Sequence, residues 1–170
     1  NYGLNRPIGD NETGFRGIED VHYRTEGWDF MTAGGALFNN LDYSFTTENE
    51  DGSFQFPGKQ PGGGGKVLRN QLRILKDVFN DLDFVRMTPA VYSQQATIPL
   101  HATVRILSEV GKQYLVYINN QASERSDTLL SGENFSDGVS LPVYLPAGNY
   151  YCEWIDPVTG SRSPVAVKNH

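Results

Sequence analysis

Glu12 is the residue of this sequence best placed to do covalent chemistry. It lies with Asp10 and Asn11 where a short predicted strand, residues 6–12, runs into a polar loop. In βα barrels the carboxyl ends of the strands carry the active site. Polar neighbours keep a carboxylate ionised, and an ionised carboxylate can attack the anomeric carbon of a glycoside while a second carboxylic acid protonates the leaving oxygen. Glu12 is therefore our candidate catalytic residue, a nucleophile; a loop-end glutamate that caps a backbone N–H or faces water is the alternative.

A second polar segment follows the next predicted strand, which begins at residue 36. It contains Asn39, Asn40, Asp42 and Tyr43. Amides and carboxylates can hydrogen-bond sugar hydroxyls, and a tyrosine ring can stack on a pyranose face. We predict that these four residues bind substrate on the same rim as Glu12, and ordinary turn-forming Asn and Asp are the alternative.

Other polar patterns in the sequence do not match a known type of binding site. The acidic residues at 48–51 lack the spacing of an EF-hand loop, so a solvated acidic loop is expected. The glycines at 62–65 precede a helix, but no Gly-Lys-Ser/Thr follows, as a phosphate-binding loop requires. The histidines at 22, 101 and 170 show neither metal-ligand spacing nor paired cysteines. We therefore expect no metal and no cofactor.

The elements that must position these residues alternate between strand and helix. After the first strand, apolar residues three to four apart predict a helix that begins near Asp20 and stops at the glycines 34 and 35. A strand over 36–38 and a long loop over 46–65 come next. Residues 67–82 then trace one apolar stripe at the 3.6-residue period, which predicts a second helix.

Beyond about residue 88 the periodicity changes from helical to two. Strands are predicted over 102–107 and 113–118, joined as a hairpin, and over 139–145, 150–155 and 164–167. Short strands separated by Pro- and Gly-containing turns indicate a β-sandwich. Along the 150–155 strand we expect one alternating set of side chains in the core, and a buried thiol at Cys152.

Composition limits the partners. The net charge is −6 and no cluster of Lys or Arg occurs, which argues against nucleic acid. No run approaches the roughly 20 apolar residues of a membrane span, and the first residues do not form a signal peptide. Because residue 1 is Asn rather than Met, we expect a fragment or a processed product. One cysteine excludes an internal disulfide.

Several motifs in order resemble the end of the catalytic barrel of bacterial apiosidase-like glycoside hydrolases. They occupy residues 6–12, 23–35, 39–45, 50–52, 61–64, 68–76 and 83–87. Residues 145–160 resemble the β-sandwich that follows that barrel, which is often labelled the collagen-binding domain of a collagenase. The resemblance covers nearly the whole chain. It implies the last βα units of a (β/α)8 barrel in residues 1–87 and a small antiparallel β-sandwich in residues 88–170.

By this resemblance, Glu12 stands at the end of the seventh barrel strand as the nucleophile of a retaining enzyme, and the acid/base lies on a fourth strand that this chain lacks. The expected function is that of a carbohydrate-active fragment whose parent hydrolyses a plant or microbial polysaccharide. Its expected partners are the carbohydrate substrate and the remainder of the barrel, and its expected location is secreted or periplasmic. The alternative is a non-catalytic glycan- or matrix-binding or structural module.

Overall fold

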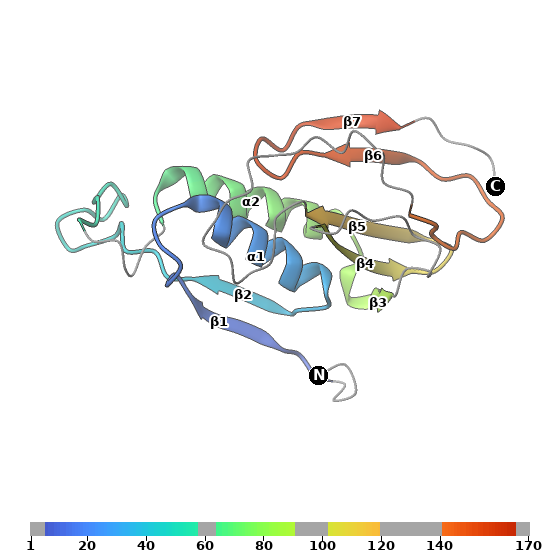
Figure 1. The fold of residues 1–170 in the computed structure, drawn as a ribbon, viewed down its shortest axis with the longest axis horizontal. Helices are drawn as coiled ribbons and strands as arrows, with labels where there is room; N and C mark the ends of the chain where they lie inside the picture. Colours follow the sequence, from blue (N-terminus) through green and yellow to red (C-terminus); the bar gives the residue numbers. More distant parts are fainter. Residues whose placement is uncertain (1–5, 58–63, 91–101, 120–140, 166–170) are drawn as a thin grey trace.

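A computed structural model describes residues 6–57, 64–90, 102–119 and 141–165. Two α-helices and seven strands form a small mixed α/β fold within these ranges (Figure 1). In chain order the elements are β1 (Gly9–Thr13), α1 (Asp20–Thr32), β2 (Leu37–Asn40), α2 (Lys66–Asn80), the 3-10 turn η2 (Phe84–Arg86), β3 (Thr88–Ala90), β4 (Thr103–Glu109), β5 (Gln113–Asn119), β6 (Cys152–Ile155) and β7 (Arg162–Val165).

The predicted fold class, the end of a (β/α)8 barrel followed by a β-sandwich, is wrong. The described strands form three small sheets, β1-β2, β3-β4-β5 and β6-β7. A barrel needs eight parallel strands, and β1 and β2 are the only parallel pair in the described part of the chain. Within the described residues, moreover, the β4-β5 hairpin packs against the helices, where the prediction expected sheet on sheet.

The first half keeps the predicted order of strand, helix, strand, helix. Helix α1 has Glu19 at its N-cap and begins at Asp20, where the predicted helix begins. Helix α2 buries one face along its length, as its apolar stripe predicted; the buried residues are Leu68, Gln71, Ile74, Leu75, Val78 and Phe79. In α1, Gly27 admits Phe38 of β2 so closely that a Cβ on this glycine would lie 3.0 Å from the ring. Helix α1 therefore packs closely against β2.

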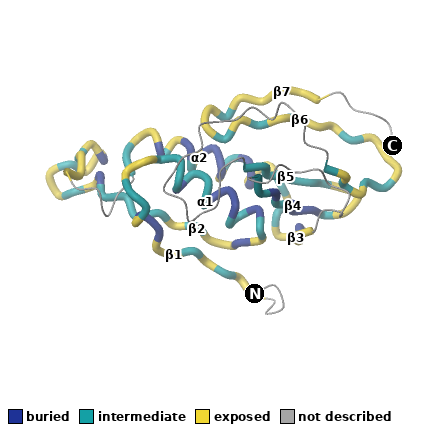
Figure 2. The backbone as a smooth tube through the Cα atoms, in the orientation of Figure 1, coloured by how far each residue is buried: buried dark blue, intermediate teal, exposed yellow. Residues whose placement is uncertain are grey.

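The core lies between the two helices and the β4-β5 hairpin, as the dark segments of Figure 2 show. Its buried members are Trp28, Ile74, Leu75, Val78, Phe79, Met87 and Leu107. Trp28 of α1 stacks on Tyr117 of β5 with ring centroids 5.6 Å apart. Burial raises the pKa of Tyr117 to about 12, because the phenolate would lose its hydration. The predicted hairpin over 102–118 is confirmed by the antiparallel pairing of β4 with β5.

An ion pair between α1 and β4 joins the two halves of the chain across this core. Arg105 of β4 donates from Nε and Nη2 to the two carboxylate oxygens of Asp29 on α1, at 3.0 and 2.9 Å. Asp29 is only 8% exposed. Planar, two-pronged pairs of this kind fix orientation as well as distance, so β4 has one allowed register against α1.

The β6-β7 hairpin lies over α2. Arg162 of β7 pairs with Asp81 just beyond α2 at 2.5 Å, and the connecting turn brings Gly160 against Ile74. Ile155 packs on the core, whereas its strand neighbour Trp154 is 63% exposed.

Several predictions for this C-terminal part are wrong. Cys152 is exposed rather than buried. Tyr151 and Trp154 are exposed, so neither aromatic side chain is in the core; burial does alternate along β6, and Ile155 is the side chain that packs on the core. Residues 141–145 form no strand, and the remainder of that predicted strand, 139 and 140, lies outside the described residues. The predicted strand over 164–167 begins earlier, at Arg162, and positions 166 and 167 also lie outside the described residues.

Candidate functional site

The candidate site lies where β1 and β2 end. The two strands pair in parallel, with Gly9 opposite Leu37 and Thr13 opposite Asn40. Their carboxyl ends therefore meet at one edge, from which the loops to α1 and α2 depart (Figure 1). In open α/β sheets this edge is where ligands bind. Glu12, Asn39 and Asn40 belong to these strand ends, as the sequence predicted, although Asn39 and Asn40 are part of β2 itself rather than of the loop after it.

An irregularity in β1 sets the direction of Glu12. Between the pairs Asp10–Phe38 and Thr13–Asn40, β1 advances three residues and β2 two, so β1 carries one extra residue at a bulge. Burial follows the same count: Asn11 and Glu12 are both exposed, and Thr13 is buried. A regular strand would have alternated. The bulge thus leaves the Glu12 side chain in solvent directly beside the buried end of the strand.

The bulge is held on both sides. The Asn39 side chain donates from Nδ2 to the backbone carbonyl of Asn11 at 3.0 Å. On the other side, the Thr13 carbonyl accepts from the amide of Leu41 at 2.8 Å, and the Thr13 hydroxyl donates to Glu26 Oε2 on α1 at 2.9 Å. Glu12 therefore lies between two residues whose backbone positions are fixed by β2.

Asn39 and Asn40 fall on opposite faces of β2. Leu37 and Asn39 are exposed, while Phe38 and Asn40 are half-buried toward the helices. Asn40 Oδ1 lies 3.5 Å from the Thr13 hydroxyl, and its amide donates to the Leu41 carbonyl at 3.1 Å. Asn39 and Glu12 are thus both exposed, whereas Asn40 is turned toward the buried side of β2.

Asp42 is engaged in a network with α2. Its Oδ2 accepts from Arg69 Nη1 at 2.7 Å, and its Oδ1 accepts from the amide and the hydroxyl of Ser44 at 3.0 and 2.5 Å. Arg69 also donates to Ser44 Oγ at 2.8 Å and stands over the Phe45 ring, 4.6 Å from its centroid. A side chain at Gly64 would collide with the same carboxylate. Both carboxylate oxygens of Asp42 therefore serve to fix the loop after β2.

These bonds set the titration of Asp42. Partial burial by itself raises the pKa of the carboxyl, but the hydrogen bonds from Ser44 and the Arg69 guanidinium outweigh it, and the net pKa lies below the ordinary value. A carboxyl whose pKa is lower in the folded than in the unfolded chain stabilises the fold above its unfolded pKa, about 4. That stabilisation is lost as the pH falls through the folded pKa.

We expect Asp42→Asn to lower the free energy of unfolding at pH 7 by about 1.5–3 kcal/mol, the range for a hydrogen bond to a charged group. The deficit relative to wild type should begin to shrink as the pH falls below about 4, where the carboxyl of the unfolded wild-type chain becomes protonated, and should vanish once the pH is below the lower pKa of the folded state. Urea unfolding at pH 7, 5, 4 and 3 measures it. Asp83→Asn, which removes an exposed ion pair with Arg86, is the control and should change stability little. A deficit that is the same at every pH would contradict this account.

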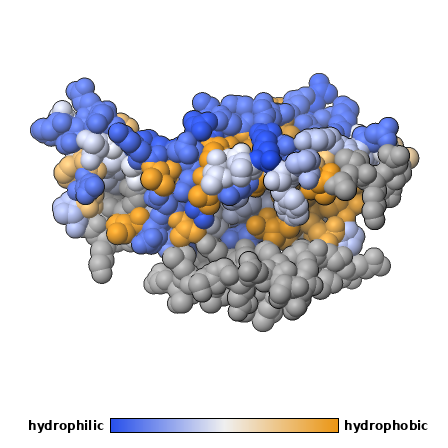
Figure 3. Space-filling model, turned by 90° about the horizontal axis from the view of Figure 1, so that it is seen from above, coloured by the Kyte–Doolittle hydropathy of each residue, from blue (hydrophilic) through white to orange (hydrophobic). Residues whose placement is uncertain are grey.

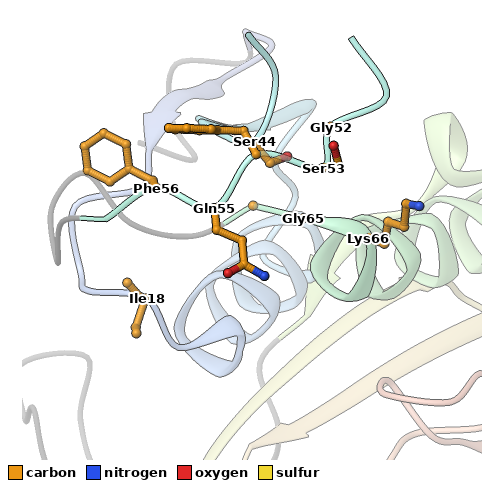
Figure 4. A pocket seen from close by; sticks show the side chains of 10 residues that line it. Ile18, Ser44, Gly52, Ser53, Gln55, Phe56, Gly65 and Lys66 are labelled. Carbon is orange, nitrogen blue, oxygen red and sulfur yellow. The ribbon is translucent and has the colours of Figure 1, made fainter. Parts of the chain in front are cut away.

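A cavity of about 490 Å³ opens among the loops at this edge (Figure 4). It is lined by apolar and polar side chains from both connections and from the start of α2, namely Ile18, Ser44, Gly52, Ser53, Phe54, Gln55, Phe56, Gly64, Gly65 and Lys66. Tyr43 reaches it indirectly, because its ring contacts Phe56 with centroids 5.7 Å apart. None of the five predicted site residues lines this cavity, so the exposed carboxylate and the cavity are separate features of the same edge.

Sequence reasoning missed the residues that organise the edge. Arg69, Glu26 and Thr13 hold Asp42 and the end of β1. Arg69 and Glu26 lie on helices, and no local motif indicates their partners, which are distant in sequence. The acidic loop gives no metal site: over residues 6–57, 64–90, 102–119 and 141–165, no three His, Cys, Asp or Glu side chains are grouped to hold an ion.

Neither helix in the described ranges combines the length and apolar character needed to cross a bilayer. Figure 3 shows apolar side chains in separate patches among hydrophilic ones on the face seen from above.

No protein-family model matches this chain, and no curated protein and no solved structure matches it either. The resemblance to apiosidase-like glycoside hydrolases therefore stays a prediction from the motifs.

Proposed function

We propose that the chain belongs to a carbohydrate-active protein, a retaining glycoside hydrolase acting on a plant or microbial polysaccharide, with Glu12 as nucleophile. The observation that carries this is the bulge of β1, which leaves the Glu12 carboxylate exposed at the carboxyl end of a parallel strand. Bulges are over-represented next to active sites because they redirect one side chain.

The chemistry assigned to Glu12 is a double displacement. One carboxylate oxygen attacks the anomeric carbon, a glycosyl ester bond forms, and the glycosidic C–O bond breaks with its electron pair going to the leaving oxygen. That oxygen takes a proton from a second carboxylic acid about 5 Å from the first. The same acid, now ionised, then removes a proton from water, which attacks the anomeric carbon and releases Glu12.

The reaction also needs a second carboxylic acid, which another segment has to supply. The motif resemblance assigns it to sequence that these 170 residues do not include. Glu12 and Asn39 are both exposed at the ends of β1 and β2, so a further segment has access to them. A polysaccharide does not enter cells intact, and we accordingly propose a secreted or periplasmic location.

The loops at the same edge suit binding of a sugar chain. The cavity combines phenylalanine rings with Ser, Gln and Lys side chains, and Tyr43 with Phe56 adds an aromatic pair at its border. Sugar sites use this mixture, because ring faces stack on C–H groups while polar groups take the hydroxyls. We assign neighbouring sugars of the polymer to this region.

Covalent trapping tests the proposal directly. The full-length protein is incubated with activated 2-deoxy-2-fluoroglycosides of common pentoses and hexoses, in which fluorine slows hydrolysis of the glycosyl ester. Mass spectrometry should locate the adduct on the peptide that contains Glu12, and Glu12→Gln should remain unlabelled. An adduct on another carboxylate would remove Glu12 from the role of nucleophile.

A non-catalytic glycan-binding function is the second candidate, and one observation favours it. Trp154 and Tyr151 at the β6-β7 hairpin are 63% and 75% exposed, and exposed aromatic rings stack on sugars. Glycan-array binding that survives Glu12→Gln but is lost in Trp154→Ala, with no hydrolysis by wild type, would select this function.

A further inference from the structure

We infer that Asn39 is a positioning residue for Glu12 rather than a contact for substrate. This rests on the proposed function, because it assigns Asn39 the task of aiming the nucleophile. The sequence suggested that the Asn39 amide binds sugar, whereas in the structure this amide is bonded to the bulge.

The bulge creates the need for such a residue. An extra residue interrupts the ladder of backbone hydrogen bonds and leaves a local group without its regular partner. Asn39 Nδ2, on the neighbouring strand, donates to the carbonyl of Asn11 at 3.0 Å. A side chain thus bonds to the backbone of the bulge one residue before Glu12.

The two residues that flank Glu12 are held by different kinds of hydrogen bond. At Thr13, a backbone bond from Leu41 and a partly buried hydroxyl bond to Glu26 act together. At Asn11, the Asn39 side chain supplies an exposed bond. Loss of Asn39 therefore releases the backbone on one side of Glu12, while Thr13 keeps the strand in place. We expect the Glu12 carboxylate to be displaced and the fold to persist.

The neighbouring Asn40 provides a matched control. It is also an asparagine of β2, but it lies on the helix side, and its amide donates to the carbonyl of the adjacent Leu41. Removing it leaves the Asn39–Asn11 bond intact. Asn40→Ala should accordingly affect the rate much less than Asn39→Ala.

The decisive experiment separates the nucleophile from its anchor. In the full-length protein, Asn39→Ala should lower kcat for a 4-nitrophenyl glycoside by about 10- to 100-fold with KM little changed, as expected for a displaced reacting group. In Glu12→Ala, added azide replaces the carboxylate: it attacks the anomeric carbon, a C–N bond forms, and 4-nitrophenolate leaves with the electron pair of the broken C–O bond. Because azide is not attached to β1, adding Asn39→Ala to Glu12→Ala should change the azide-dependent rate by less than about 3-fold.

Each outcome decides between the claims. A similar loss in both backgrounds, or a raised KM with unchanged kcat, would mean that Asn39 contacts the sugar, and would overturn this inference while leaving Glu12 as nucleophile. Absence of azide rescue in Glu12→Ala, with Asn39 intact, would overturn the proposed function and the aiming role with it.

A second readout does not depend on activity. Hydrogen exchange of the peptide spanning residues 9–14 should be faster in Asn39→Ala and in Asn39→Ser, with exchange in α2 unchanged. Either variant suffices if the other folds poorly. Unchanged exchange at the bulge in a folded variant would contradict the anchoring role.

Discussion

Replacing Glu12 with glutamine should reduce kcat for 4-nitrophenyl glycoside hydrolysis by at least about 10³-fold, the scale seen when a catalytic nucleophile is removed. Glutamine has nearly the same shape, but its amide oxygen cannot form the glycosyl ester. Because Glu12 is exposed on the bulge, the substitution leaves no buried group unpaired, and the fold should persist.

The measurement is the steady-state rate of nitrophenolate release by the full-length protein, with circular dichroism to verify folding. Glu50→Gln, an exposed glutamate in the loop after β2, is the matched control and should retain wild-type kcat. Wild-type rates in the Glu12 variant would exclude it as the nucleophile.

The two tryptophans of this chain should respond in opposite ways to truncation. Trp28 is 3% exposed and stacked on Tyr117, whereas Trp154 is 63% exposed. Trp28→Ala should lower the free energy of unfolding by about 3–5 kcal/mol through lost burial and a cavity. A loss of that size is a large share of the stability of a small protein, and partial unfolding at 37 °C is expected.

Trp154→Ala should change stability by no more than about 0.5 kcal/mol, because its ring already faces solvent. Urea unfolding followed by far-ultraviolet circular dichroism compares the two variants on one scale. Equal costs would contradict a core built between the helices and the β4-β5 hairpin.

Local structure was predictable wherever one period dominated. The apolar stripe of α2 identified the helix, and alternation around the turn at Gly111 identified the β4-β5 hairpin. Both patterns involve residues that are close together in the sequence. In both elements, the apolar side chains of the pattern face the core.

Arrangement was not predictable in the same way. Strand and helix order is compatible with a barrel or with a two-stranded sheet, and the choice depends on which surfaces bury against each other. Here α2 and Trp28 cover the β4-β5 hairpin, so the described part of this hairpin packs on helices. The exposure of Trp154 has the same origin, because Ile155 and not Trp154 faces the covered side.

In the candidate site, too, some features could be predicted from the sequence and others could not. The strand-end positions of Glu12 and Asn39 followed from the predicted order of elements. The bulge did not, since it depends on register between two strands separated by a helix. The roles of Asn40 and Asp42 likewise depend on distant Thr13 and Arg69, and no spacing rule in a single sequence indicates such partners.

The Asp29–Arg105 ion pair limits which parts of this chain can be exchanged for those of another protein. A crossover near residue 88 exchanges the antiparallel half for that of another protein and separates the two charges. A buried charge that loses its partner costs about 3–5 kcal/mol, enough to unfold many small proteins. Chimeras should therefore be recovered when both positions come from one parent or when the incoming half supplies its own cation, and lineages that shuffle modules should transmit these two residues together.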